Sequence, residues 1–444
     1  MKPYLPTRLH EQSTPSIMKS RHRSPNGCPS ATAIREKNNM LSVGSFNWEQ
    51  GHWSSGKNPE ATLCIAGDWA PIRKFKPIIE TDPTAIYGDL FPIIHSTDLS
   101  IVNLEAPLSD RGTPVNKSGA VFKGEIRHVS GLTAPPFDAV TLANNHVFDF
   151  GLGAFKDTLD TLEKNQIQWT GAGMSIEEAA KPLILTAKGL KIAVVNFSEG
   201  EDLTAAGKGP GVMGWEIPRL ENQIQTLKQT VDLVIVIAHC GLEYIPFAPP
   251  YVMKAFEKMA EAGADAVIGH HPHVPQGIKF HRGVPICCSL GNFVFYQDTD
   301  LYFRKLGYMV KIGLTRDALV CLDLIPYQIQ EGGLSTLKDQ KRANFFTRFK
   351  EISLPLDTPE GINDAWNGFL HHYGRNGFKN EVAMIMEKIE TDPQKGGAMF
   401  RNRLTTSQHF YHWRDLLNRM VKGELETSPS WAQTLAREWL TRKI

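Results

Sequence analysis

The stretch that decides how this sequence is interpreted is Ala264-Asp265-Ala266-Val267-Ile268-Gly269-His270-His271-Pro272-His273. Its first five residues are mostly apolar and predict a buried strand that ends in a turn. Three histidines follow, and neutral imidazole is the commonest metal-binding side chain. His271 and His273 lie two positions apart, so an extended backbone held by Pro272 would point both the same way. The stretch predicts a strand that delivers metal ligands at its carboxyl end; the alternative is a polar turn with chance histidines.

The composition is that of an ordinary globular protein, with 444 residues, 41% hydrophobic and 21% charged, enough for two or three domains. Lys and Arg number 48 against 47 Asp and Glu, so no overall field favours nucleic acid or an anionic membrane. The six cysteines lack metal-finger or redox spacing. We find neither a signal peptide nor a membrane span. These features predict a cytoplasmic protein without a nucleic-acid partner or an integral membrane segment.

Three segments of different character divide the chain. Residues 1–60 are rich in Ser, Pro, Asn, Lys and Arg and predict a disordered leader. Residues 61–328 alternate strand and helix patterns and predict the folded domain. Residues 329–444 carry charged and aromatic residues at helical spacing and predict a helical C-terminal extension without a catalytic signature. The His371-His372 and His409/His412 pairs in this extension are interpreted as packing or solvated histidines.

Four apolar runs in the folded domain each lead into a polar residue. The runs at 61–66, 99–104, 139–143 and 233–238 precede Asp68, Glu105, Asn145 and His239. Ligands bind at the carboxyl ends of strands in layered α/β folds. Helical patterns lie at 152–164 and 249–262, a β-hairpin at 183–197, and further strands at 285–290, 308–314 and 320–326. The predicted fold class is α/β, a β-sandwich with helices packed outside it and closed by later antiparallel strands.

The residues at these strand ends form one candidate ligand set of carboxylates, an amide and imidazoles: Asp68, Glu105, Asn145, His239, His271 and His273. Such ligands suit Zn, Mn or Fe better than a thiolate-selected metal. Glu105 is the best candidate to bridge two ions ~3.5–4 Å apart, an arrangement that promotes phosphoryl or acyl transfer. His146 would then be free to donate a proton to a leaving group. Each residue alone has an ordinary structural explanation, but the series at successive strand ends predicts a metal site.

Six motifs in the same order resemble the CapA family, which is associated with poly-γ-glutamate capsule synthesis. They are Gly67-Asp68, Asn103-Leu104-Glu105-Ala106-Pro107, Leu142-Ala143-Asn144-Asn145-His146 with Asp149 and Gly151, His239-Cys240-Gly241-Leu242-Glu243-Tyr244, Gly269-His270-His271-Pro272-His273, and Ser289-Leu290-Gly291-Asn292-Phe293-Val294-Phe295. The resemblance covers about residues 61–298. It implies the four-layer β-sandwich, flanked by helices, of the calcineurin-like metallophosphoesterases, with one or two divalent ions (Mn, Fe or Zn).

The resemblance implies the ligands named above and the same role for His146, with two departures. Ala70 stands where the phosphoesterase pattern has a histidine, and Glu105 replaces the usual aspartate. A single tightly held ion and a weakened pair both fit this pattern. Either His270 or His271 could face the metal, and the spacing to His273 favours His271.

Further residues are expected to support the site or contact substrate. Glu243 and Tyr244 follow His239 closely enough to orient it or to touch substrate, and Asn292 is either a hydrogen-bonding group at the same edge or a turn residue. The segment after Glu105 contains Arg111, Lys117 and Lys123 and is expected to be a solvated loop, although such a loop could close over an anionic substrate.

Two functions are compatible with these features. The first is a CapA-like protein of poly-γ-glutamate synthesis with a metal-dependent phosphoesterase-type hydrolase site that acts on a phosphoester or an anionic polymer, alongside capsule-synthesis partners. The alternative is a non-catalytic metal-binding accessory protein that binds or handles such a polymer.

Overall fold

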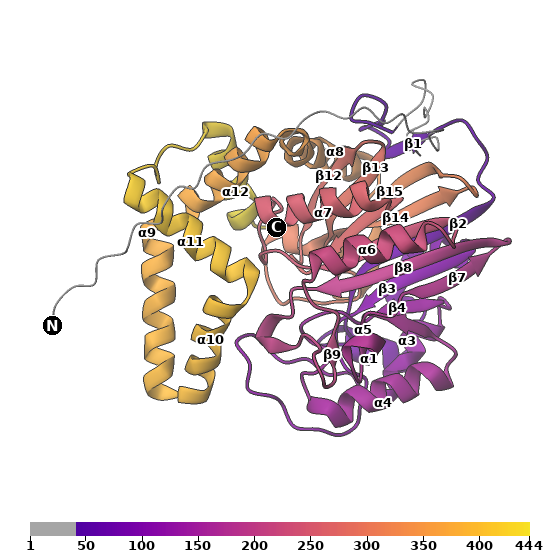
Figure 1. Ribbon diagram of the computed structural model, residues 1–444, viewed down its shortest axis with the longest axis horizontal. Coiled ribbons are helices and arrows are strands. Elements are labelled where there is room, and N and C mark those ends of the chain that lie inside the picture. Colours follow the sequence, from indigo (N-terminus) through magenta and orange to yellow (C-terminus); the bar gives the residue numbers. More distant parts are fainter. Residues whose placement is uncertain (1–40) are drawn as a thin grey trace, which may run out of the picture. The chain divides into compact units, whose positions relative to one another are not determined.

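The computed structural model describes residues 41–444, so the predicted leader lies outside the described residues up to position 40 (Figure 1). Two sheets contain most of the described strands. The larger has the order β1-β15-β14-β2-β3-β4-β5, with β16 paired to β15, and the smaller has the order β12-β13-β11-β10-β8-β7. The strands of the larger sheet are β1 (His52–Ser54), β2 (Ala61–Trp69), β3 (Leu99–Leu104), β4 (Ala139–Thr141), β5 (Gln168–Thr170), β14 (Leu306–Leu314), β15 (Leu319–Gln330) and β16 (Gly333–Thr336). The remaining strands are β7 (Leu183–Ala187), β8 (Leu190–Ser198), β10 (Leu233–His239), β11 (Ala266–His270), β12 (Pro275–His281) and β13 (Val284–Leu290), with β6 (Ala172–Gly173) and β9 (Gly211–Val212) forming a small separate pair.

Helices follow the strands throughout and dominate the last quarter of the chain. Those of the first part are α1 (Phe75–Thr81), α2 (Phe91–His95), α3 (Ser130–Thr133), α4 (Gly151–Lys164), α5 (Ile176–Ala179), α6 (Ile217–Leu227) and α7 (Pro250–Ala262). The last part contains α8 (Asp339–Ser353), α9 (Pro359–Thr391), α10 (Pro393–Thr405), α11 (Ser407–Lys422) and α12 (Ser430–Thr441). Short 3-10 segments are η1 (Ala85–Leu90), η2 (Ile126–Val129), η3 (Glu201–Leu203), η4 (Tyr302–Lys305) and η5 (Leu354–Asp357).

Apolar side chains alternate along the central strands, so each sheet buries both of its faces. In β2, Leu63 and Ile65 face the core between the sheets, whereas Cys64 and Ala66 face the outer core under α1, η1 and α4. The smaller sheet alternates in the same way, and its outer face packs against α6 and α7 (Figure 1). The four layers are therefore helix, sheet, sheet and helix, which confirms the predicted sandwich flanked by helices.

The strand directions place the carboxyl ends of the parallel strands along one edge of each sheet. β2, β3, β4 and β5 run parallel in one sheet, and β8, β10, β11 and β13 run parallel in the other. Antiparallel strands β14, β7 and β12 flank these sets. The predicted hairpin is confirmed as β7 and β8. The carboxyl ends of each parallel set thus lie along one edge of its sheet, where polar side chains can meet.

The boundaries of the folded domain differ from those expected. Residues 41–60 were assigned to the leader, but β1 pairs with β15, and Leu41, Phe46 and Trp53 are buried in the core between the sheets. Three large apolar side chains hold this segment although its sequence has no periodicity. At the other end, β15 continues past residue 328 and β16 pairs back onto it. The sequence patterns do not predict strand β12 or helix α6.

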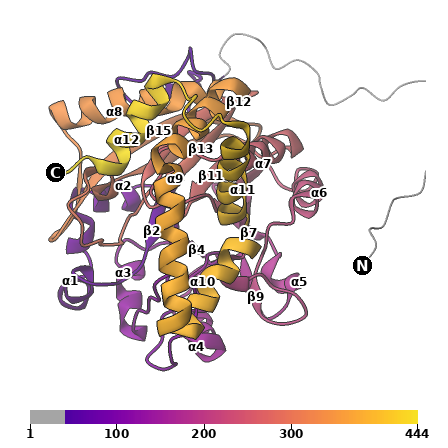
Figure 2. The same ribbon diagram turned by 90° about the vertical axis from the view of Figure 1, so that its left-hand side faces the viewer.

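The C-terminal helices pack on the sandwich and also form a small core of their own, in which Trp366, Phe369 and Leu416 meet Leu242 and Ile245. α8 contributes Phe345 and Phe349 to the core between the sheets, and Trp439 of α12 stacks on Phe303 with ring centroids 3.8 Å apart. Helix α9 changes direction at Gly374, where φ is +57°. Figure 2 shows α10 and α11 following it along the same side of the molecule. We call residues 393–422, which form α10 and α11, the C-terminal arm.

Membrane spans are absent from the helices of residues 41–444, none of which combines the length and the apolar content that a crossing requires.

Candidate metal centre

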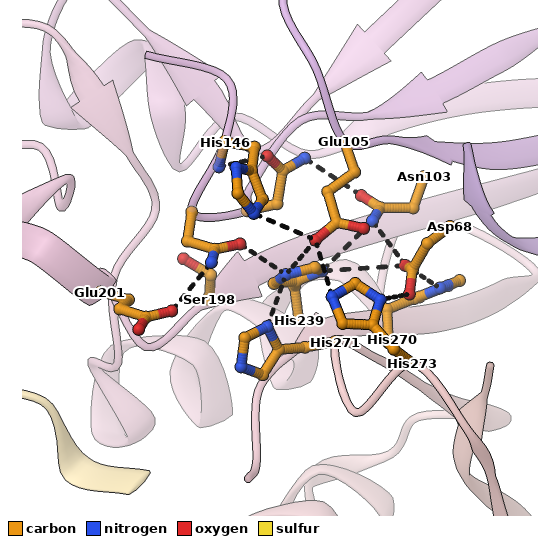
Figure 3. A network of polar contacts seen from close by, with 12 residues as sticks. Asp68, Asn103, Glu105, His146, Ser198, Glu201, His239, His270, His271 and His273 are labelled. Atoms are coloured by element: carbon orange, nitrogen blue, oxygen red, sulfur yellow. Dashed lines mark hydrogen bonds and ion pairs between the residues drawn. The ribbon is translucent and has the colours of Figure 1, made fainter. Parts of the chain in front are cut away.

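Polar side chains from both sheets meet at the carboxyl ends of the parallel strands. Asp68 is at the end of β2 and Glu105 directly follows β3, whereas His239 ends β10 and His271 follows β11 (Figure 3). All four side chains are buried. The convergence predicted from the strand-end series is therefore present, and it joins segments from opposite halves of the sandwich.

A close backbone contact sets the position of Asp68. The register of β2 shifts between Ala66 and Asp68, and Asp68 forms an isolated bridge with Asn292 of the other sheet's edge. A Cβ atom on Gly67 would lie 2.2 Å from the carbonyl oxygen of Gly291, so only glycine permits this approach. The Gly67-Asp68 pair thus ties the two sheets together at the site.

The first ligand group consists of Asp68, Glu105 and His273, whose ligand atoms all lie within 4.8 Å of one another. Nδ1 of His273 is 3.4 Å from Oδ2 of Asp68, and Nε2 of His273 is 3.7 Å from Oε1 of Glu105. These separations are longer than hydrogen bonds and leave space for an ion between the three side chains. Ala70, at the position where the phosphoesterase pattern has a histidine, is packed among apolar residues and adds no ligand.

The second ligand group consists of Glu105, His239 and His271, with Asn145 beside them. Nε2 of His239 is 3.3 Å from Oε1 of Glu105, 3.0 Å from Nδ1 of His271 and 3.0 Å from Oδ1 of Asn145. One ring nitrogen donates at most one proton, so it cannot satisfy three acceptors by hydrogen bonding. A shared cation would satisfy all of these atoms together.

Unpartnered atoms indicate where a cation fits. Both carboxylate oxygens of Glu105, Oδ2 of Asp68 and Nε2 of His270 are buried without a hydrogen-bond partner. Buried polar atoms almost always have a hydrogen-bond partner, so four buried atoms without one in the same cluster require an explanation. Glu105 belongs to both ligand groups, and two of the four unpartnered atoms are its carboxylate oxygens. The donor set therefore fits one ion in each group, with Glu105 as the shared ligand.

Burial and neighbouring charges shift the pKa values of the clustered side chains in opposite directions. Burial raises the pKa of the Glu105 carboxyl well above its usual range, and the charge of Asp68 adds to this. Burial also acts to raise the pKa of Asp68, but the hydrogen bond with His270 and the charges of His270 and His273 outweigh it and hold that pKa well below its usual range. Burial opposes protonation of His273, yet the nearby carboxylates raise its pKa to about 10. The Glu105–His273 pair thus retains a proton at neutral pH, which a divalent cation would displace.

Neighbouring side chains orient the candidate ligands. Asn103 of β3 donates to Oδ1 of Asp68 at 2.8 Å, and Nδ1 of His270 lies 3.2 Å from the same oxygen. Oδ1 of Asn292 accepts a hydrogen bond from Nδ1 of His273 at 2.9 Å, which places Asn292 at the predicted edge. Of His270 and His271, only His271 belongs to one of the ligand groups among the described residues, and its role as a ligand stays a prediction. Asn103 was not identified from the sequence, because it is one of six buried residues within a strand.

The histidine turn reaches this arrangement by a route that differs from the expected one. His271 and His273 have φ values of +96° and +57°, so the backbone at both positions is left-handed and not extended. Such conformations cost about 1–3 kcal/mol each in non-glycine residues and concentrate at functional sites. Tyr244, whose φ is +66°, carries the same strain, and its N–H donates to the carbonyl of Pro272 at 2.7 Å.

His146 lies beside the ligand groups but belongs to neither. Its Nδ1 is 2.6 Å from Oδ2 of Asp149, and its Nε2 is 3.9 Å from Oε1 of Glu105. Burial lowers the pKa of His146, although the charge of Asp149 opposes this. Lys117 is buried and bonds Oδ1 of Asp149 at 2.9 Å, which contradicts the solvated position expected for it. This buried pair fixes the ring of His146 with its Nε2 toward the cluster.

A cavity of about 340 Å³ opens above the cluster. His146, His273 and Asn145 lie in its wall, together with Glu243 and Tyr244. Two arginines also lie in the wall: Arg73, which donates to the carbonyl of Tyr296, and Arg304, whose guanidinium lies 3.6 Å from the centre of the Tyr244 ring. Both Glu243 and Tyr244 therefore occupy positions where they can contact a bound molecule.

Residues of the C-terminal arm also reach the site, which the sequence did not suggest. Oε1 of Gln408 is 2.9 Å from Nε2 of His271, and Asn402 donates to Glu201, which in turn accepts from Asn145. His409 lies 3.5 Å from Glu201, whereas His412 packs among aromatic rings and its pKa is lowered to about 3 by burial.

Comparison with known proteins places this arrangement in a family. The model of the family described as "Bacterial capsule synthesis protein PGA_cap" matches residues 62–297. The capsule biosynthesis protein CapA of Bacillus anthracis is 28% identical over 62% of this chain and 69% of its own length. The PGA biosynthesis protein CapA of Bacillus subtilis is 31% identical over 64% of this chain and 73% of its own length. A solved 5′-nucleotidase precursor of Thermus thermophilus is similar at 12% identity and a TM-score of 0.38, over 65% of this chain and 58% of that one. The chain belongs to the PGA_cap family of bacterial capsule synthesis proteins.

Proposed function

We propose that this protein acts in poly-γ-glutamate synthesis and carries a metal-dependent hydrolase site of the phosphoesterase type. The observation that supports this most strongly is Glu105, which lies in both ligand groups and has two buried oxygens without partners. A carboxylate in this state is costly unless a cation is bound. The proposed ligands are those predicted from the sequence: Asp68, Glu105, Asn145, His239, His271 and His273.

Nitrogen and oxygen donors without a thiolate favour Mn, Fe or Zn over softer metals. Two bound metal ions would stabilise the negative charge on the attacking and leaving oxygens when the substrate bond is displaced. The protein's own groups would do the rest. Nε2 of His146 faces the cavity and would exchange a proton with the leaving group, while Asp149 holds the ring from its other side. Arg73 and Arg304 would bind an anionic part of the substrate.

A second candidate function is metal-dependent binding of an anionic polymer without turnover. A probable polyglutamine synthesis accessory protein of Mycobacterium tuberculosis is 27% identical over 55% of this chain and 70% of its own length. That name favours an accessory role. The two candidates differ in whether bond cleavage occurs, so one set of variants can separate them.

The test measures metal content and turnover together. Purified protein would be loaded with Mn, Fe or Zn, its metal content determined, and phosphomonoesters, phosphodiesters and γ-glutamyl polymers offered as substrates. We expect His146→Ala to lose turnover, typically 10²–10⁴-fold for a proton-transfer group, with unchanged metal content. We expect His273→Ala to lower metal content, and His95→Ala, at an exposed position, to change neither.

The outcomes are distinct. Metal binding without turnover on any substrate would support the accessory function and refute the hydrolase. An unchanged metal content in His273→Ala would contradict the proposed ligands.

A further inference from the structure

We infer that the C-terminal arm orients His271 of the second ligand group and the neighbouring Asn145, with Gln408 and Asn402 as positioning residues. The arm follows the region matched by the family model, which ends at residue 297. The inference rests on the proposed metal centre and adds a part of the chain to it. It predicts that one of the two ions depends on the arm and the other does not.

Gln408 acts on His271. Its Oε1 lies 2.9 Å from Nε2 of His271, and both side chains are buried. An amide oxygen there accepts a hydrogen bond from the N–H at Nε2, so the proton of the neutral ring is on Nε2 and the free lone pair is on Nδ1. Nδ1 is the atom that faces the second ligand group, 3.0 Å from Nε2 of His239. Gln408 therefore selects the tautomer of His271 that can bind an ion, as partners of metal-binding histidines generally do.

Asn402 acts on Asn145 through Glu201. Asn402 donates to Oε1 of Glu201 at 2.8 Å, and Nδ2 of Asn145 donates to Oε2 of Glu201 at 2.8 Å. The carboxylate of Glu201 thus fixes the amide of Asn145 with its Oδ1 toward His239, 3.0 Å from Nε2.

The loop that carries Glu201 is strained and needs this support. Asp202 and Leu203 have φ values of +56° and +66°, next to Gly200 at +66°. The carboxylate of Asp202 accepts from Ser118 at 2.7–3.1 Å, and Arg401 of the arm lies 3.7 Å from it. Strained backbone of this kind persists only where its surroundings determine it. The arm is part of those surroundings, since α10 contacts η3 directly.

The first ligand group has no comparable partner from the arm among the described residues. Asp68 is held by Asn103 and His270, and His273 is held by Asn292. All three partners belong to the sandwich. Loss of an arm contact should therefore weaken the ion of the second ligand group and spare that of the first.

The experiment titrates metal-free full-length protein with Mn²⁺ and resolves the binding steps by calorimetry. Replacing an outer partner of a metal ligand typically lowers affinity about 10- to 100-fold. We expect Gln408→Leu to weaken one step by about that factor, and Asn402→Leu to weaken the same step. Asn292→Ala, which removes the partner of His273, should weaken the other step.

Two further variants separate positioning from packing. Gln408→Glu restores an acceptor opposite Nε2 of His271 and should keep the step that Gln408→Leu weakens, whereas a packing role would be served better by leucine. Gln394→Ala removes an exposed contact between the arm and Asn116, and should change no step.

Equal affinities in Gln408→Leu and the wild type would overturn the inference, as would a loss that Gln408→Glu does not rescue. If wild-type protein binds no ion under any condition, the proposed metal centre fails and the inference fails with it. Two ions bound independently of the arm would overturn the inference alone.

Discussion

Compared with a glutamine at the same position, Glu105 should lower the free energy of unfolding of the metal-free protein and raise that of the metal-loaded protein. Both of its carboxylate oxygens are buried without a partner, and Asp68 lies in the same ligand group. Leaving a buried polar atom unpaired costs about 1–3 kcal/mol. Glu105→Gln keeps the shape of the side chain and removes the ionisable group. An amide N–H in place of Oε1 would lie 3.3 Å from Nε2 of His239, close enough to relax into a hydrogen bond.

The variant should therefore be more stable than wild type by about 1–3 kcal/mol when chelator is present. With metal at 100 times its dissociation constant, the wild type should gain about 2.7 kcal/mol for each ion. Glu105→Gln lacks the charged ligand that both groups share, so its gain should be close to zero. The order of stability should thus reverse between the two conditions.

Equilibrium urea unfolding in EDTA and in Mn²⁺ measures both quantities on the same preparations. Glu257→Gln is the matched control, because Glu257 is paired with Lys279 far from the ligand groups. That variant should lose stability slightly and keep the full response to metal. A Glu105→Gln protein that is less stable than wild type in EDTA, or that keeps the full metal response, would refute the reasoning.

Two predictions concern protons. Metal binding at pH 7 should release about one proton from the Glu105–His273 pair. Calorimetric titrations in several buffers would measure this proton, because the binding heat should then vary with the ionisation enthalpy of the buffer. A binding heat that is the same in every buffer would contradict the prediction. Because the pKa of His273 is about 10 without metal, apparent affinity should rise with pH until that value. Proton donation by His146 requires its charged form, so kcat/KM should fall as pH rises through its pKa, which burial places below the ordinary 6.5 or so. Asp149 raises that pKa, so Asp149→Asn should move the fall to lower pH, and a shift to higher pH would exclude this role.

The strand-end ligands could be predicted because their signals are local. A buried parallel strand is a run of apolar residues, and the polar residue after it falls at the functional edge whatever the rest of the chain does. This logic placed Asp68, Glu105 and His239 correctly at strand ends. It also gave the hairpin of β7 and β8 and the helices that follow the strands. Their roles as ligands remain predictions.

The partners of these residues had no local signal. Gln408 meets His271 across 137 positions of sequence, from a helix whose pattern indicates only an exposed and a buried face. Lys117 lies in a segment rich in Gly, Pro and Ser, which indicates solvent, yet it is buried because Asp149 neutralises it. Phe46 and Trp53 reach the core from a stretch without periodicity. In each case a contact distant in sequence determines the environment, and composition does not encode it.

The same edge of the sandwich collects features that each cost stability. Glu105 is buried without partners, and His271 and His273 adopt left-handed backbone conformations. Local rules are usually broken together where function requires it. Ion retention alone would account for these features. It would not require the His146–Asp149 pair, which belongs to neither ligand group and holds Nε2 of His146 3.9 Å from Oε1 of Glu105, in the wall of a cavity of about 340 Å³. A protein that only held metal would gain nothing from a proton carrier beside an open cavity, so this pair favours turnover over retention.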